Sequence, residues 1–241
     1  MTINLIDIRK YEKNVLFNGV CKARQDYSVR FSKQKSEKNV KLSLASEYSL
    51  NQIMTRIYPN MTLPLDIKHD KSGCPIFSDK TVSEFKNKYD INPYFSLSHS
   101  GDYACSVISD YQVGIDIEKM EKRDGEKISN FAHRFFCREE TEWINSDVVR
   151  FYMVWCAKEA FLKASGLAGK LAMSGFRVEI VEESKINSGK EINLKYDYQA
   201  DDNQSGLYVG KILLDKSDEG YMMAVCSLQN SSDIIDCEIF V

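Results

Sequence analysis

The chain has 241 residues, of which 43% are hydrophobic and 28% charged, and its formal net charge at pH 7 is -3. This length and composition are typical of a globular protein with one large or two small cores. The slight excess of acids excludes nucleic-acid binding driven by overall charge, so any basic site must be local.

The cysteines and the N-terminus indicate the cellular compartment. The 7 cysteines include no C-x-x-C pair, so they predict neither a disulfide framework nor a zinc site. Residues 1–9 carry charges too early for a signal peptide, and no run of about 18 apolar residues occurs. We therefore expect a reduced, cytoplasmic protein that does not enter a membrane.

The first part of the chain predicts a strand followed by a helix. Residues 3–8 are rich in isoleucine and leucine, which favours a leading strand. A basic stretch over 24–41 is, taken alone, typical of a solvated face. The apolar spacing over 42–58 predicts an amphipathic helix that ends before Pro59. Residues 68–75 have the composition of a loop.

Three strands are predicted next. The alternating run over 95–102 ends in a turn, and 103–109 and 112–119 predict two strands joined by a short connection at residues 110 and 111.

The rest of the chain predicts two helices and then strands. The helices cover 124–143 and 149–164, and Gly166 suits a C-terminal cap of the second. After Gly175 the pattern alternates in four segments, 176–180, 192–196, 207–213 and 221–228. The predicted fold class is α+β, with a long helix and antiparallel strands in each half.

Two acids in the predicted strand over 113–119 suggest a metal site. Asp116 and Glu118 are two residues apart, so they project from one face of a strand. Gly114 allows another backbone or a ligand to approach closely. A single surface acid is usually only solvated, but adjacent like charges cost free energy unless a cation lies between them. Such oxygen ligands suit Mg²⁺ or Mn²⁺.

A third acid and a lysine lie in the second helix. Glu159 and Lys163 are one helical turn apart, which alone would indicate an ion pair worth roughly 0.2–0.5 kcal/mol. The aromatic residues Trp155 and Phe161 suggest that the helix is buried, where an idle charged pair would be costly. We therefore predict a metal ligand and a cation that pairs with phosphate.

His99 lies in the segment FSLSHSG over 95–101. A lone histidine is more often a structural hydrogen-bonding residue. Beside an anionic phosphate, however, its charged form would be stabilised.

Four segments in this order and spacing resemble the signature blocks of the Sfp-type 4′-phosphopantetheinyl transferases: 95–101, VGIDIEK over 113–119, 134–140 and WCAKEAFLK over 155–163. The resemblance implies two similar α/β halves that form a pseudo-dimer with coenzyme A in the cleft between them. Residues 1–110 would form the nucleotide and 3′-phosphate side, and residues 111–241 the metal and carrier side.

The resemblance also implies an enzyme. A member of this family transfers the 4′-phosphopantetheine arm of coenzyme A to a serine of an acyl or peptidyl carrier protein, with Mg²⁺ as cofactor, and releases adenosine 3′,5′-bisphosphate. This reaction serves secondary metabolite biosynthesis among other pathways. A monomer with no nucleic-acid or membrane partner is expected.

The family's site residues carry over to matching positions. The implied metal ligands are Asp116, Glu118 and Glu159, and the implied catalytic residues are Glu159, Lys163 and Glu140. Either Glu159 or Glu140 would serve as general base. The implied coenzyme A contacts are Arg30, Lys38, Lys41, Gly73, Pro75, Ser98, His99 and Lys163. One departure is Cys74, which stands where the family has a lysine.

Carrier docking in the family uses segments that correspond to 128–136 and 166–178. The larger apolar residues of these segments suit either docking or core packing, and we expect core packing for at least half of them. The residues are Phe131, Phe135, Leu167, Leu171 and Met173.

Two other functions fit the same acids. A Mg²⁺-dependent phosphohydrolase or nucleotidyltransferase would release phosphate from coenzyme A without a carrier. A non-catalytic carrier-binding module would bind its partner without metal dependence or turnover.

Overall fold

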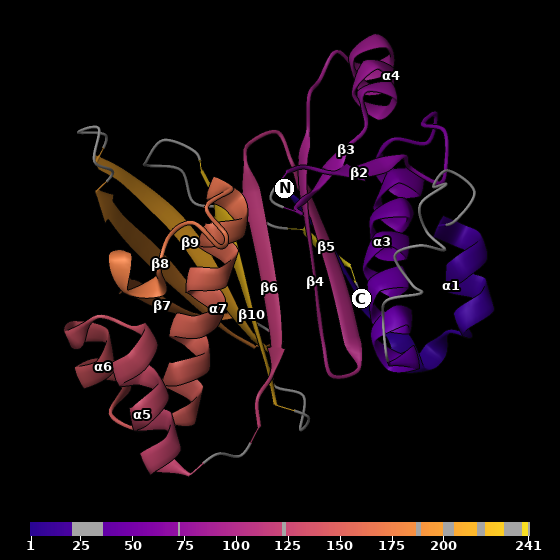
Figure 1. Cartoon of the computed structure of the whole chain (residues 1–241). Coiled ribbons are helices and arrows are strands. Elements are labelled where there is room, and N and C mark those ends of the chain that lie inside the picture. The colour runs from indigo at the N-terminus through magenta and orange to yellow at the C-terminus, as the bar shows by residue number, and fades with distance from the viewer. Residues whose placement is uncertain are drawn as a thin grey trace. The chain divides into compact units, whose positions relative to one another are not determined.

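A computed structural model gives the fold, and it describes residues 1–20, 36–71, 73–121, 124–186, 189–199, 205–215, 220–228 and 238–240 (Figure 1). The chain divides into two compact units, residues 1–111 with 236–241 and residues 112–235, which are described separately. The sequence patterns did not predict that the C-terminal residues belong with the first unit.

The first unit packs helices against a mixed sheet. Its elements are β1 (Thr2–Asp7), η1 (Ile8–Lys10), α1 (Lys13–Val20), α3 (Glu37–Ile57), β2 (Ile67–His69), β3 (Pro75–Phe77), α4 (Asp79–Tyr89), β4 (Tyr94–Ser100), β5 (Tyr103–Ser109) and β11 (Glu238–Phe240). The sheet has the order β11-β1-β5-β4, with β1 parallel to β11 and the other neighbours antiparallel. Strands β2 and β3 form a separate hairpin.

The long helix α3 provides the core of the first unit. Ser36 caps it by accepting a hydrogen bond from the Asn39 amide, so the helix begins earlier than the apolar spacing predicted. Leu50 and Ile53 on its buried face pack in one cluster with Phe95 of β4. The alternation of β4 therefore turns one face of that strand toward α3.

The second unit packs helices against an antiparallel sheet. Its elements are β6 (Val113–Lys119), α5 (Gly125–Phe135), α6 (Arg138–Ile144), α7 (Val148–Ser165), η3 (Met173–Gly175), β7 (Arg177–Ile186), β8 (Gly189–Gln199), β9 (Ser205–Asp215) and β10 (Tyr221–Ser227). The sheet order is β6-β10-β9-β8-β7. Helix α7 lies on this sheet, with α5 and α6 beside it (Figure 1).

Two local predictions are corrected. Strands β5 and β6 form as predicted, but they lie in different sheets, so residues 110 and 111 do not close a hairpin. The helix predicted over 124–143 is two helices, because the backbone at Phe136 is extended. Helix α6 starts after Cys137, its N-cap residue, which forms a capping box with Glu140.

The α+β class is confirmed, and each unit packs a long helix on antiparallel strands, as predicted. The pseudo-dimer arrangement stays a prediction. Within the described ranges, no helix combines the length and hydrophobicity needed to span a bilayer.

Candidate active site

The acidic face of β6 is the centre of the candidate site. Asp116 and Glu118 lie on the same face of this strand, as their spacing predicted. Strand β10 supports them from the side, with Ala224 opposite Asp116 and Met222 opposite Glu118. Asp116 is only 4% exposed, whereas Glu118, nearer the end of the strand, is partly exposed.

Gly114 allows α7 to cross this face of the strand. A Cβ atom at position 114 would lie 1.9 Å from the Ala160 carbonyl oxygen and 2.6 Å from the Ala164 amide nitrogen. Both are backbone atoms, which cannot move aside as a flexible side chain can. The close approach predicted for Gly114 is therefore the contact between β6 and α7.

This contact brings Lys163 of α7 onto Asp116. The Lys163 Nζ lies 2.7 Å from Asp116 Oδ1 and donates a second hydrogen bond of 3.0 Å to the Ile115 carbonyl. An ammonium thus neutralises the more deeply buried of the two strand carboxylates. The lysine was predicted to pair with phosphate, and in this structure its anionic partner is Asp116.

Glu159 lies one helical turn before Lys163 and is partly exposed. Burial raises the pKa of its carboxyl, and the negative charge of Asp116 raises it further, while Lys163 opposes both effects. A carboxyl with a raised pKa takes up a proton more readily at neutral pH than an ordinary glutamate does. This is the property that a general base requires.

Cys156 is a buried residue of α7 that lies near the two strand acids. Its thiol is fully buried and donates a weak hydrogen bond of 3.7 Å to the Met222 carbonyl. Burial raises its pKa, and the charges of Asp116 and Glu118 raise it further. The thiol is therefore held neutral and is not a nucleophile. Sequence reasoning missed this residue, although its position one turn before Glu159 and Ala160 indicates the same helix face.

The donor set suits a divalent cation, but it is not preassembled. Asp116, Glu118 and Glu159 offer only hard carboxylate oxygens, the type that Mg²⁺ prefers. The effect of Asp116 on the pKa of Glu159 shows repulsion that a cation would relieve. Across the described part of the chain, however, no group of three or more histidine, cysteine or acidic side chains is arranged to hold a metal ion. Lys163 supplies the positive charge instead.

Glu140 lies in a different environment. It is 3% exposed and forms an ion pair with Lys158, with 2.9 Å between Lys158 Nζ and Glu140 Oε1. It also accepts hydrogen bonds from the backbone amides of Cys137 and Val178. Nothing in this geometry supports its assignment as a general base, which stays a prediction. Sequence reasoning missed the role of Lys158.

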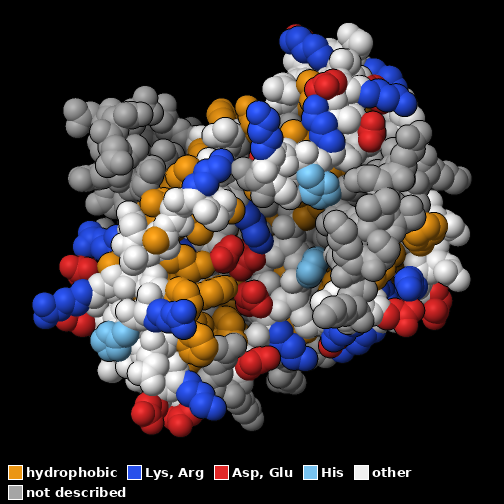
Figure 2. Space-filling view, in the orientation of Figure 1, with side chains coloured by type: hydrophobic (Ala, Val, Ile, Leu, Met, Phe, Trp, Pro, Cys, Tyr) orange, Lys and Arg blue, Asp and Glu red, His pale blue; other side chains and the backbone are white. Residues whose placement is uncertain are grey.

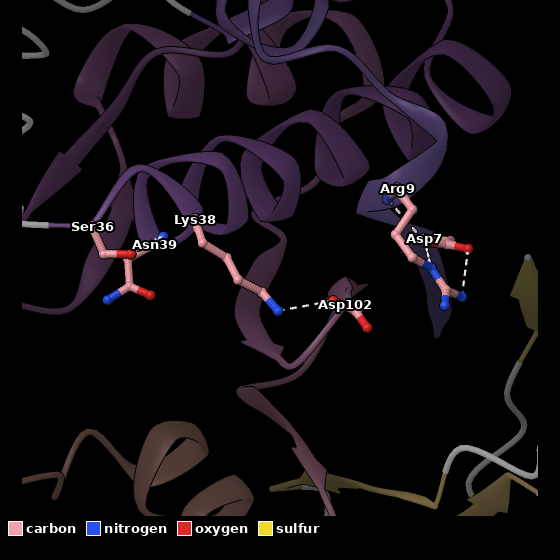
Figure 3. A network of polar contacts seen from close by, with 6 residues as sticks. All are labelled: Asp7, Arg9, Ser36, Lys38, Asn39 and Asp102. Atoms are coloured by element: carbon pink, nitrogen blue, oxygen red, sulfur yellow. Dashed lines mark hydrogen bonds and ion pairs between the residues drawn. The ribbon is translucent and has the colours of Figure 1, made fainter.

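In the first unit, the structure brings Lys38 to the turn that follows His99. Lys38 Nζ, from the first turn of α3, lies 2.9 Å from Asp102 Oδ1 in the β4–β5 turn (Figure 3). Asp7 and Arg9 form a second ion pair of 2.9 Å in the same view. A predicted phosphate ligand therefore pairs with a carboxylate of this chain.

His99 and Ser98 lie on opposite faces of β4. His99 is exposed and shares its face with Phe95, which packs against α3, whereas Ser98 is buried. Lys41 is partly exposed and lies one helical turn after Lys38 in α3. Arg30 lies outside the described residues.

The segment with the unusual cysteine forms a tight turn between β2 and β3. Gly73 has a φ of 85° and donates a hydrogen bond of 3.0 Å to the Asp70 carbonyl. The Cys74 amide donates to Asp70 Oδ1 at 2.9 Å, and Pro75 begins β3. Glycine suits this position because an L side chain rarely adopts a positive φ. The turn presents a partly exposed thiol where the family has an ammonium.

The predicted docking residues mostly pack against the core of the second unit. Four of the five are partly buried against its main cluster: Phe135, Leu167, Leu171 and Met173. Phe131 is 38% exposed and stacks on Phe135 at 6.2 Å between ring centroids. On the face seen in Figure 2, hydrophobic and acidic side chains lie next to one another over α7 and β6.

Comparisons with known proteins agree with the motifs. Residues 112–226 match the family model described as the 4′-phosphopantetheinyl transferase superfamily. This match contains every residue predicted to bind the metal or to act in catalysis, although the roles themselves stay predictions. The family resemblance predicted from the motifs is confirmed.

Three relatives show how far the similarity extends. The chain is 29% identical over 154 residues to 4′-phosphopantetheinyl transferase psf-1 of Bacillus pumilus, which covers 60% of this chain and 59% of that protein. It is 25% identical over 178 residues to 4′-phosphopantetheinyl transferase gsp of Aneurinibacillus migulanus, and the alignment covers 72% of this chain and 67% of that protein. It is 27% identical over 139 residues to 4′-phosphopantetheinyl transferase Sfp of Bacillus subtilis strain 168, and the alignment covers 56% of this chain and 54% of that protein. The chain thus spans between 54% and 67% of the length of these relatives.

Proposed function

We propose that this chain, a relative of the Sfp-type 4′-phosphopantetheinyl transferases, transfers the 4′-phosphopantetheine arm of coenzyme A to a serine of an acyl or peptidyl carrier protein. The observation that carries the proposal is the meeting of Asp116, Glu159 and Lys163 where α7 crosses β6, inside the segment that matches the family. Acids that can bind a cation and an ammonium beside them are the groups that a reaction at a diphosphate needs.

The acids would hold Mg²⁺. Asp116, Glu118 and Glu159 are the proposed ligands, and the bound ion would neutralise charge on the diphosphate of coenzyme A. Lys163 reaches Asp116 through a flexible stem, so its ammonium can turn to a phosphate oxygen when another cation satisfies Asp116.

The chemical step joins the serine oxygen to the β-phosphorus of coenzyme A. The bond between that phosphorus and the bridging oxygen breaks, and adenosine 3′,5′-bisphosphate leaves with the electron pair. The serine proton must go to a base, and Glu159 is the proposed acceptor, directly or through a water.

The first unit is proposed to hold the nucleotide part of coenzyme A. Lys38 contacts Asp102 in the turn of the β4–β5 hairpin, three residues after His99 in the chain. A bound phosphate would have to compete with Asp102 for Lys38. The remaining proposed contacts are Arg30, Lys41, Gly73, Pro75 and Ser98.

The protein is further proposed to act as a monomer in the cytoplasm, on carriers of secondary metabolite biosynthesis. The phenylalanines of α5 are proposed to contact the carrier, since Phe131 is partly exposed beside Phe135.

Release of adenosine 3′,5′-bisphosphate tests the proposed reaction. The protein is mixed with Mg²⁺ and coenzyme A, and with an apo carrier, with the same carrier after its acceptor serine is replaced by alanine, or with no carrier. We expect release only with the intact apo carrier. Equal release without a carrier would instead indicate a phosphohydrolase.

A further inference from the structure

The second unit contains a buried ion pair that the proposed reaction does not use. The side chains of Lys158 in α7 and Glu140 in α6 are 0% and 2% exposed, with 2.9 Å between Nζ and Oε1. Removing two charges from water is costly, so such a pair persists only where further hydrogen bonds satisfy both groups.

Those hydrogen bonds join three parts of the unit. Lys158 Nζ donates to the Met173 carbonyl at 2.6 Å and also to the Phe176 carbonyl. Glu140 accepts from the Val178 amide at 2.7 Å through Oε1 and from the Cys137 amide at 3.1 Å through Oε2. The pair therefore ties the start of α6 and the chain over 173–178 to the middle of α7.

The Phe176 ring strengthens this arrangement. Its centroid lies 4.2 Å from Lys158 Nζ, within the range of a cation–π contact. Burial lowers the pKa of Lys158, while the charge of Glu140 opposes this shift. The geometry of the pair agrees with this, since the carboxylate lies 2.9 Å from the buried ammonium.

Helix α7 is thereby held on two sides. Ala160 contacts Gly114 on β6, and Lys158, two residues earlier, projects roughly to the opposite side of the helix toward residues 173–176. Glu159 lies between these two anchors in the sequence. A rotation of α7 about its axis would break one anchor or both and would move the Glu159 carboxyl relative to Asp116.

We propose that Glu140 and Lys158 are positioning residues, which hold α7 in the rotation that sets the Glu159 carboxyl beside Asp116. Both oxygens of Glu140 are engaged by donors of this chain, so its carboxylate acts on the structure of the site and not on the substrate. Only the kinetic part of this inference rests on the proposed transferase activity.

Two variants and a matched control test the pair. Glu140→Gln leaves the Lys158 ammonium buried without its counter-charge, and Glu140→Gln combined with Lys158→Met removes both charges. Glu142→Gln is the control, because Glu142 lies on the same helix in an exposed pair with Arg138. Each full-length protein is assayed for transfer to an apo carrier, for Tm, and for hydrogen exchange in peptides that cover 155–163 and 173–178.

Glu140→Gln should lower Tm by on the order of 10 °C, reduce transfer at least about 10-fold and speed exchange in both peptides. The double variant should recover part of each loss, while the control should match the wild type. Unchanged exchange in Glu140→Gln would overturn the inference. So would a folded double variant with restored exchange but no recovery of transfer, since that is the behaviour of a missing base. If the wild type transfers nothing to any carrier, the proposed function fails, yet the exchange data still decide whether the pair fixes α7.

Discussion

Asp116 is almost fully buried, and a carboxylate in that position needs a cation nearby. In this structure the cation is Lys163 of α7, 2.7 Å away. In the proposed reaction, Asp116 would be a ligand of the divalent ion, and Lys163 would then be available to a substrate phosphate. Asp116 is thus the carboxylate that both Lys163 and the proposed Mg²⁺ ion would contact.

The substitution Asp116→Asn tests this connection. The asparagine keeps the shape of the side chain but removes the negative charge, so we expect transfer to fall at least about 100-fold. The matched control is Asp124→Asn, which changes the exposed N-cap of α5 into another good capping residue and should leave transfer unchanged. Circular dichroism checks that both variants fold. Transfer by Asp116→Asn within a few-fold of the wild type would remove Asp116 from the site.

Gly114 is the residue on which the contact between β6 and α7 depends. Gly114→Ala would place a Cβ against backbone atoms of Ala160 and Ala164, so α7 must shift with Glu159 and Lys163. We expect a loss of about 1–3 kcal/mol in the free energy of unfolding, together with a loss of transfer. Denaturant titration and the transfer assay measure these effects. Gly125→Ala is the control, because the nearest atom to its Cβ would be Ser146 Cβ at 3.3 Å, and the Ser146 carbonyl oxygen and Oγ would lie at 3.9 Å, in ordinary contact. Equal stability of the two variants would contradict the account.

Residue spacing was sufficient to predict the shared strand face of Asp116 and Glu118. It also predicted that Glu159 and Lys163 lie on one helix face, because both rules act over a few residues. Spacing could not predict the partner of Lys158, which comes from another helix 18 residues earlier in the chain.

Most of the helices and strands were predictable from the sequence, but which strands pair with one another was not. The alternation and helical periodicity located β4, β5, β6 and α7 closely, since those patterns reflect which faces are buried. That β5 pairs with β1 while β6 pairs with β10 follows from long-range contacts that no local pattern records. The break at Phe136 was missed because the apolar spacing continues across it.

Helix α4 offers a test of pH dependence in the first unit. Burial alone would raise the pKa of Glu84, but hydrogen bonds from Lys88 and Thr62 outweigh it and lower the pKa below the ordinary 4.5. A lowered pKa in the folded state contributes stability above the unfolded pKa, and this stability is lost as the pH falls through the folded pKa. Glu84→Gln should therefore cost about 1 kcal/mol at pH 7. The difference from the wild type should decrease as the pH falls below 4.5 and should vanish below the lowered pKa of the folded state.

Thermal unfolding of both proteins from pH 7 downward measures this difference. Asp79→Asn on the same helix is the control, since Asp79 is 96% exposed in its pair with Lys68 and should affect Tm little at any pH. A Glu84→Gln effect that stays constant down to the acid limit would show that the carboxylate charge is not what stabilises this helix.

For the whole molecule, the α+β class was predictable because the helical and alternating patterns occur in both halves of the chain. The return of β11 to pair in parallel with β1 was not, since the strand is only three residues long and its partner lies at the other end of the chain. The segment that matches the family, residues 112–226, lies entirely within the second unit. The second unit alone therefore carries the proposed metal and catalytic residues.

The most direct test of the proposed activity is the intact mass of a panel of apo acyl and peptidyl carrier proteins after incubation with this protein, Mg²⁺ and coenzyme A. We predict that at least one carrier gains the mass of a single phosphopantetheine group with the wild type and not with Asp116→Asn. No mass gain on any carrier, under conditions in which a known transferase modifies the same panel, would contradict the proposal.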